Sequence, residues 1–133
     1  MDHKRSNKVK ILVVEDEPAV REFVSSQLRS LGYEVTAVAS GAEALQQLAL
    51  DDSFRFDLLF TDIVMPEGVS GVELARRARR AFGSDLKVLL TSGYPREILE
   101  ETDQPNVDMP LLRKPYRRQD LDEAIQEALA SHT

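Results

Sequence analysis

The chain has 133 residues, of which 42% are hydrophobic and 30% are charged. This length is enough for one domain that buries roughly two thirds of the surface of the unfolded chain. A net charge of −6 argues against non-specific nucleic-acid binding, and the absence of cysteine excludes disulfide bonds and thiolate metal sites. No apolar run approaches the roughly 20 residues of a membrane span, and the polar start lacks a signal-peptide core, so we expect a cytoplasmic protein without direct membrane contact.

Short apolar runs rich in β-branched residues alternate along the chain with helical patterns. Strands are expected at residues 9–14, 33–38, 56–61 and 86–92, and a weaker fifth strand at 109–113. Helices are expected at residues 18–31, 41–50, 71–82 and 117–130, and a shorter helix at 95–101.

Three of the helical patterns predict which face is buried. In the first helix the apolar stripe consists of Val20, Phe23, Val24, Leu28 and Leu31. In the last helix the inward residues are Leu121, Ala124, Ile125, Ala128 and Leu129. The third helix carries Leu74, Ala78 and Ala81 at helical spacing, which places its four arginines on a solvated face rather than on a nucleic-acid surface.

Five β-α units in strict alternation predict an α/β fold, in which helices cover both faces of a parallel sheet. Right-handed crossovers favour the flavodoxin-like (βα)5 arrangement, a doubly wound five-stranded sheet with strand order 2-1-3-4-5. The units fill residues 9–131 after an N-terminal extension at 1–8, and we expect no second domain.

Polar residues follow the predicted strands at their carboxyl ends, where open parallel sheets bind ligands. They are Glu15, Asp16 and Glu17 after the first strand, Asp62 after the third, Thr91 and Ser92 after the fourth, and Lys114 after the fifth. Because the first and third strands are neighbours in the predicted order, Glu15 and Asp16 should converge on Asp62.

Three carboxylates in one crevice repel each other unless one keeps a proton or a cation lies among them. Oxygen ligands without cysteine or a nearby histidine favour a hard ion, and a small open site that keeps waters favours Mg²⁺ over Ca²⁺. Simpler interpretations stay open for single residues. Asp16 or Glu17 before Pro18 can begin a helix, and Asp62 can cap a turn. Lys114 can form a structural ion pair.

The same residue types also suit phosphoryl transfer. A lysine, a hydroxyl and a metal around one acid can bind the peripheral oxygens, which carry the charge of the transferring group. Asp62 can then be the nucleophile that becomes an aspartyl-phosphate, with Lys114 and Ser92 as its partners.

The sequence resembles the receiver domains of two-component response regulators over almost its whole length. The resemblance rests on the segments "ILVVEDEP", "FTDIVMP", "SGVELA", "LLTSGY" and "LLRKPY". The order and spacing of Asp62, Ser92 and Lys114 agree as well. The loop "MPEGVSG" holds one more residue than the commonest form, as in many receivers of hybrid sensor histidine kinases.

The resemblance implies that Asp62 accepts a phosphoryl group from the phosphohistidine of a sensor histidine kinase or a histidine phosphotransfer protein, or from a small acyl phosphate. It further implies that Lys114 pairs with Asp62 and then with a phosphoryl oxygen, and that Ser92 donates a hydrogen bond to another. The peptide bond before Pro115 is expected to be cis.

The resemblance also implies a cofactor, Mg²⁺ or Mn²⁺. Its ligands would be Asp16, Asp62 and the backbone carbonyl of Val64, and Glu15 would act through a water on the metal. Glu15 departs from the family pattern, because most members carry Asp there.

Signalling would follow from a phosphorylation-dependent change of shape that controls partner binding. The face formed by the fourth strand, the fifth strand and the last helix is expected to bind a downstream protein or a second copy. The switch candidates are Ser92, Tyr94 and Leu111. Leu111 stands where many members carry an aromatic residue that swings inward, so an aromatic switch is excluded at this position. Tyr94 can substitute for it or can be a surface tyrosine without that role.

Three other functions compete with this interpretation. An aspartyl-nucleophile phosphatase needs a second Asp two residues after the first, where this chain has Val64. A nucleotide- or flavin-binding module needs a glycine- or hydroxyl-rich loop where this chain has "EDEP". A degenerate receiver that only docks partners would not need the complete set, which is Glu15, Asp16, Asp62, Ser92 and Lys114.

Overall fold

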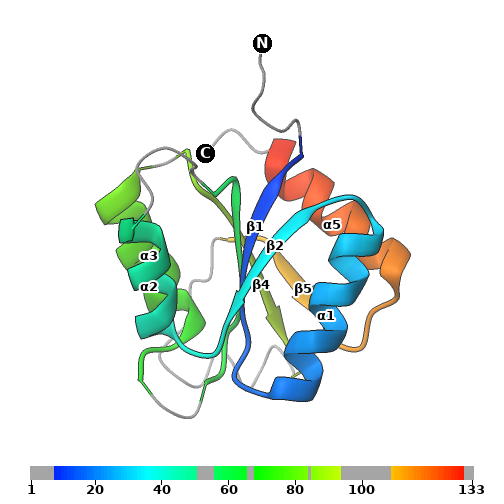
Figure 1. The fold of residues 1–133 in the computed structure, drawn as a ribbon, viewed down its shortest axis with the longest axis horizontal. Helices are drawn as coiled ribbons and strands as arrows, with labels where there is room; N and C mark the ends of the chain where they lie inside the picture. The colour runs from blue at the N-terminus through cyan, green and yellow to red at the C-terminus, as the bar shows by residue number, and fades with distance from the viewer. Residues whose placement is uncertain (1–7, 51–55, 66–67, 84, 94–108, 131–133) are drawn as a thin grey trace.

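The structure is a computed structural model in which five parallel strands form one sheet between two helical layers (Figure 1). It describes residues 8–50, 56–65, 68–83, 85–93 and 109–130. The strands are β1 (Lys10–Val14), β2 (Glu34–Val38), β3 (Leu58–Asp62), β4 (Lys87–Ser92) and β5 (Leu111–Arg113). Their order is β2-β1-β3-β4-β5, so the predicted flavodoxin-like topology is confirmed.

Two helices cover each face of the sheet within the described residues. Helices α1 (Pro18–Ser30) and α5 (Arg118–Ala130) lie on one face, and α2 (Gly41–Leu50) and α3 (Gly71–Phe82) lie on the other (Figure 1). The predicted boundaries agree with these elements within two residues. The short helix predicted at residues 95–101 lies outside the described residues, as do the extension before Lys8 and the residues after Ala130.

The core consists of two clusters, because successive strand residues face opposite sides of the sheet. Leu12, Leu59 and Leu90 pack toward α2 and α3. Their strand neighbours, such as Ile11 and Phe60, pack toward α1 and α5. Burial on both sides explains why the strands read as continuous apolar runs, and every residue of β3 is buried.

The sequence marks the ends of the helix that lies beside the site. The Ser70 side chain caps α3 by accepting a hydrogen bond from the Glu73 backbone N–H at 3.2 Å. At the other end of the helix, Gly83 adopts φ +94°, a backbone conformation that residues with a Cβ rarely adopt. Ser70 thus fixes the start of α3 next to the carboxyl end of β3, and Gly83 ends the helix.

Two predictions about helix faces were wrong. Phe23 is 59% exposed, because α1 meets the sheet through the narrower stripe of Val24 and Leu28 and leaves Phe23 at its edge. Ala81 is exposed in the last turn of α3, where the helix extends beyond its contact with the sheet. The predicted inner face of α5 is confirmed, with Leu121, Ile125 and Ala128 buried and Ala124 and Leu129 packed partly against the same cluster.

The arginines of α3 do not form one fully solvated face. Arg77 and Arg80 are exposed, and Arg77 Nε and Arg80 Nη2 lie 3.1 and 3.7 Å from Glu73 Oε2. Arg76 and Arg79 are partly buried.

The described ranges contain no helix with the length and apolar character that crossing a membrane requires.

Candidate functional site

Three carboxylates converge at the carboxyl ends of β1 and β3, as the predicted strand order requires. Glu15 and Asp16 directly follow β1, Asp62 ends β3, and one carboxylate oxygen from each residue lies within 4.8 Å of the others. Register pairing of Val14 with Thr61 places these strand ends side by side. Such a cluster of anions requires a cation, a proton or both among its members.

Glu15 is held in place by both its side chain and its backbone. Its Oε2 accepts a hydrogen bond from the Glu17 backbone N–H at 3.1 Å, and its backbone N–H donates to the Val38 carbonyl at 3.1 Å. The Arg21 guanidinium donates to the Glu15 carbonyl at 2.9 Å. These contacts tie the loop after β1 to β2 and to the first turn of α1.

The surroundings of Glu15 favour a proton or a metal ion on this group. Burial raises the pKa of the Glu15 carboxyl, and the nearby Asp62 and Asp16 raise it further, while the Glu17 N–H and Lys114 oppose the shift. Glu17 occupies the cap position of α1, but its side chain makes no capping hydrogen bond. The Glu17 side chain therefore does not cap α1, whereas the Glu15 carboxylate accepts a hydrogen bond from the backbone N–H of this cap residue.

Lys114 faces the cluster from the end of β5. Its Nζ lies 3.1 Å from Asp62 Oδ2 and 3.4 Å from Glu15 Oε1, and its backbone N–H donates to the Ser92 carbonyl at 2.9 Å. Burial alone would lower the pKa of the Lys114 ammonium, but the two carboxylates outweigh burial and raise it. The ammonium thus stays charged. The peptide bond between Lys114 and Pro115 is cis, as expected.

The start of α3 packs closely against the backbone of Asp62. The Gly71 N–H donates to the Ile63 carbonyl at 2.8 Å, and a Cβ at Gly71 would overlap the carbonyl oxygen of Asp62. Within the described ranges no backbone N–H donates to the Asp62 side chain, whose hydrogen-bond donor is Lys114. The Asp62 carboxylate is buried, and its contact with Lys114 favours a functional role over turn capping.

The other predicted site residues are Ser92, Val64, Leu111 and Tyr94. Ser92 ends β4 with 1% of its surface exposed, beside the backbone of Lys114. Val64 follows Asp62 by two residues, and its side chain is 38% exposed. Leu111 is half-buried against the cluster under α2 and α3, and Tyr94 lies outside the described residues.

Three residues of the site, Arg21, Gly71 and Tyr116, were not predicted from the sequence, whereas Thr91 was predicted at the end of the fourth strand and lies there. Arg21 and Gly71 hold the loops that carry Glu15 and Asp62. Burial and the carboxylates of Glu15 and Asp62 raise the pKa of the Tyr116 phenol. The Thr91 hydroxyl is buried without a hydrogen-bond partner in the described part of the chain, and lines a small cavity with Glu15 and Tyr116. The sequence held a signal for two of the missed residues, because Gly71 lies in the segment "SGVELA" and Tyr116 in the segment "LLRKPY", on which the resemblance rests.

Comparison with known proteins agrees with this geometry. The sequence profile of the response regulator receiver domain matches residues 11–126. The chain belongs to the response regulator receiver family. The receiver is 38% identical over 120 residues to the response regulator receiver protein CpdR of Brucella abortus, which covers 90% of this chain and 96% of that protein.

A second relative is much longer than the receiver. The sensor kinase CckA of Brucella abortus is 33% identical over 124 residues, which cover 93% of this chain and only 13% of the kinase. The crystal structure of the receiver domain from the hybrid histidine kinase CckA has a TM-score of 0.70 and 34% identity, and covers 90% of this chain and 98% of that one. These matches support the predicted similarity to receivers of hybrid kinases.

Other solved receivers share the fold. A response regulator receiver protein from Sinorhizobium medicae has a TM-score of 0.78 at 28% identity and covers 94% of this chain and 97% of that one. The response regulator TrrA from Thermotoga maritima, solved in complex with Mg²⁺-BeF, has a TM-score of 0.75 at 31% identity, with 90% and 98% covered.

Proposed function

We propose that residues 9–131 form a receiver domain, preceded by an extension at 1–8, that accepts a phosphoryl group on Asp62 in an Mg²⁺-dependent reaction. The donor is the phosphohistidine of a sensor histidine kinase or a histidine phosphotransfer protein in the cytoplasm. The observation that carries the proposal is the 3.1 Å contact of Lys114 Nζ with Asp62 Oδ2 beside two further carboxylates.

The donor set fits a hard divalent ion. The three carboxylates supply only oxygen atoms, which Mg²⁺ and Mn²⁺ prefer over thiolates, and the chain has no cysteine. Asp16, Asp62 and the Val64 carbonyl would hold the ion directly, and Glu15 would contact its hydration shell. When bound, the ion neutralises the carboxylates and the oxygens of the incoming phosphoryl group.

Asp62, Lys114 and Ser92 each have a separate role in the transfer. An Asp62 oxygen attacks phosphorus, and the bond from phosphorus to the donor histidine nitrogen breaks, with its electron pair passing to the imidazole. Asp62 and Glu15 raise the pKa of the Lys114 ammonium, so it is charged before the transfer, and it then moves from Asp62 to a phosphoryl oxygen. Ser92 donates a hydrogen bond to another phosphoryl oxygen.

Phosphorylation alone shifts the conformation only in part. Moving a two-state protein from 1:99 to 99:1 requires about 5.5 kcal/mol of differential binding. A charged hydrogen bond from Lys114 and a neutral one from Ser92 together contribute roughly 2–4.5 kcal/mol. A downstream protein or a second copy on the β4, β5 and α5 face supplies the rest, with Ser92, Tyr94 and Leu111 as switch candidates. Full amide-exchange protection of residues 92–116 in the isolated phosphorylated monomer would contradict this.

The role is that of a signalling domain that hydrolyses its own aspartyl-phosphate. Val64 stands two residues after Asp62 with an apolar, partly exposed side chain that cannot transfer a proton, which disfavours a phosphatase. Sustained turnover of a phosphate ester by the protein would refute this choice.

The experiment is labelling with acetyl phosphate and Mg²⁺, followed by intact-protein mass spectrometry. The proposal predicts one phosphoryl group per chain for the wild type and for the exposed control Glu127→Gln on α5, and none for Asp62→Asn. Equal labelling of Asp62→Asn would show a different acceptor. A wild type that takes no label would make the chain a docking module.

A further inference from the structure

Arg21 closes a ring of hydrogen bonds around the loop between β1 and α1. Its Nη1 donates to the Glu15 carbonyl at 2.9 Å, and its backbone N–H donates to the Glu17 carbonyl at 2.8 Å. The Glu17 N–H in turn donates to Glu15 Oε2 at 3.1 Å. Asp16 lies between the two tied residues, so its backbone is fixed from both sides.

The ring joins the carboxylate cluster to rigid parts of the fold. Arg21 is partly buried near the start of α1, and its carbonyl accepts a hydrogen bond from the buried Ser25 hydroxyl at 2.7 Å. On the other side of the loop, the Glu15 N–H donates to the Val38 carbonyl at the end of β2. The loop that carries Glu15 and Asp16 is thus held between a helix and a strand.

The charge of Arg21 and its position act on a bound metal ion in opposite directions. Its guanidinium bonds to a backbone carbonyl, and no acidic side chain of the described ranges forms an ion pair with it. A cation at this position repels a metal ion, so its charge alone weakens metal binding. Any affinity gained through Arg21 must therefore come from the position that it gives to Glu15 and Asp16.

A fixed loop matters more for Mg²⁺ than for Ca²⁺. Mg²⁺ requires nearly octahedral ligands at about 2.0–2.1 Å, whereas Ca²⁺ accepts ligands at about 2.3–2.6 Å in variable number and geometry. A loop that moves costs the larger ion little affinity, because its ligands can adjust. The smaller ion loses affinity when the groups that orient its ligands are removed.

We propose that Arg21 is a positioning residue that makes the carboxylate cluster selective for Mg²⁺ over Ca²⁺. Arg21 acts through the backbone of Glu15 and is not itself a ligand of the ion. The inference rests on the function proposed above, in which Glu15 and Asp16 belong to the site of the ion that phosphoryl transfer requires.

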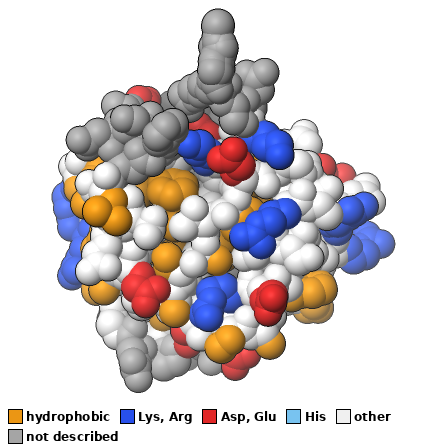
Figure 2. Space-filling view, in the orientation of Figure 1, with side chains coloured by type: hydrophobic (Ala, Val, Ile, Leu, Met, Phe, Trp, Pro, Cys, Tyr) orange, Lys and Arg blue, Asp and Glu red, His pale blue; other side chains and the backbone are white. Residues whose placement is uncertain are grey.

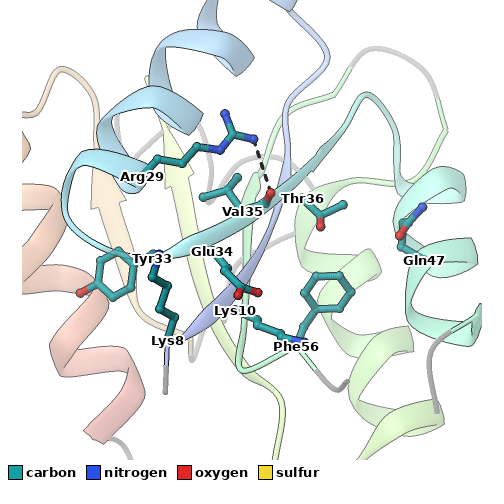
Figure 3. A pocket seen from close by; sticks show the side chains of 9 residues that line it. All are labelled: Lys8, Lys10, Arg29, Tyr33, Glu34, Val35, Thr36, Gln47 and Phe56. Carbon is teal, nitrogen blue, oxygen red and sulfur yellow. Dashed lines mark hydrogen bonds between the residues drawn. The ribbon is translucent and has the colours of Figure 1, made fainter. Parts of the chain in front are cut away.

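Arg29 offers a matched control farther along the same helix. Basic and acidic side chains are interspersed on the face that Figure 2 shows, so the loss of one charge there creates no new charged patch. The exposed Arg29 also donates to a backbone carbonyl, because its Nη2 lies 3.4 Å from the oxygen of Val35 (Figure 3). It lines a groove beside β2 that shares no residue with the carboxylate cluster.

The test measures the dissociation constants of Mg²⁺ and Ca²⁺ by NMR titration of the isotope-labelled protein. Arg21→Met should weaken Mg²⁺ binding at least ~10-fold, as is typical when a group that orients a metal ligand is removed. Its Ca²⁺ binding should change less than ~3-fold, because Ca²⁺ tolerates variable geometry. Arg29→Met should bind both ions as the wild type does. Arg21→Lys keeps the charge and one donor, and its Mg²⁺ affinity should lie between those of the wild type and Arg21→Met.

A second measurement needs no metal. In the metal-free protein, amide exchange at Glu17 should be faster in Arg21→Met than in the wild type, because the ring has lost one bond. Exchange at the buried Val24 of α1 should be unchanged. Circular dichroism controls for folding. If Arg21→Met does not fold, Arg21→Lys decides, since it should still bind Mg²⁺ more weakly than the wild type.

Four results would overturn the proposal. Tighter Mg²⁺ binding by Arg21→Met than by the wild type would show that the charge of Arg21 outweighs its position. An equal loss of affinity for both ions would mean that Arg21 only stabilises the loop. Unchanged Mg²⁺ binding would refute this inference and leave the proposed function intact, whereas a wild type that binds neither ion would refute both.

Discussion

Helix α3 packs closely against the end of β3 at Gly71, and Gly71→Ala should disrupt this contact. A Cβ there would overlap the Asp62 carbonyl oxygen and lie 2.8 Å from the Asp62 carbonyl carbon and 2.9 Å from Ile63 Cα. All three neighbours are backbone atoms, so no side chain can rotate away. The start of α3 must therefore move away from β3.

The size of the effect follows from three contributions. Overpacking of this kind costs typically about 1–3 kcal/mol, and loss of the Gly71 N–H bond to the Ile63 carbonyl costs about 0.5–1.5 kcal/mol. Alanine regains up to ~1 kcal/mol over glycine in a helix. We expect a net loss of about 0.5–4.5 kcal/mol in the free energy of unfolding, and slower labelling of Asp62 because its backbone shifts.

The assay is urea unfolding followed by circular dichroism, with Gly93→Ala as the matched control. Among the described residues, a Cβ at Gly93 would meet only Lys114 side-chain atoms at 3.9 Å, an ordinary contact. Gly93→Ala should therefore change stability by less than ~0.5 kcal/mol. If Gly71→Ala unfolds at the same urea concentration as the wild type, the argument from close approach is refuted.

Three further predictions concern the polar groups of the chain. Lys114→Met removes the ammonium that contacts Asp62 and should slow acetyl phosphate labelling at least ~10-fold, equivalent to about 1.4 kcal/mol; an unchanged rate would contradict its role. Thr91→Val deletes a buried hydroxyl without a described partner and should leave the free energy of unfolding unchanged or raise it by up to ~1 kcal/mol; a clear loss in urea unfolding would reveal a hidden partner. Burial and Asp122 raise the pKa of Tyr33 to about 12 from a usual value of 10.0, so the folded state retains the phenol proton longer than the unfolded state does. The wild type should have a larger free energy of unfolding than Tyr33→Phe below pH 10, and this difference should disappear as pH rises to about 12. A difference that persists above that pH would count against the Tyr33–Asp122 bond.

Much of the fold could be predicted because it depends on local patterns. The strands β1, β3 and β4 each contain at least three consecutive apolar residues, since a parallel sheet is buried on both faces, and strict alternation with helices leaves few topologies. The acidic residues were predicted to meet because strand order alone makes the ends of β1 and β3 neighbours.

The rest depended on contacts between distant parts of the chain. Helical spacing could not show that Phe23 lies at the edge of the apolar stripe, because the width of the contact is set by the sheet below α1. The need for glycine at position 71 appears only when α3 is placed against Asp62. The hydrogen bond from Arg21 to the Glu15 carbonyl joins a side chain to a backbone group, which leaves no pattern in the sequence.

The most direct test of the site is a magnesium titration followed by two-dimensional NMR of the isotope-labelled protein. The account predicts saturable shifts centred on Glu15, Asp16 and Asp62, with a smaller change at Lys114, and their loss in Asp16→Asn. Spectra that do not respond to Mg²⁺, or that respond at another part of the chain, would contradict it.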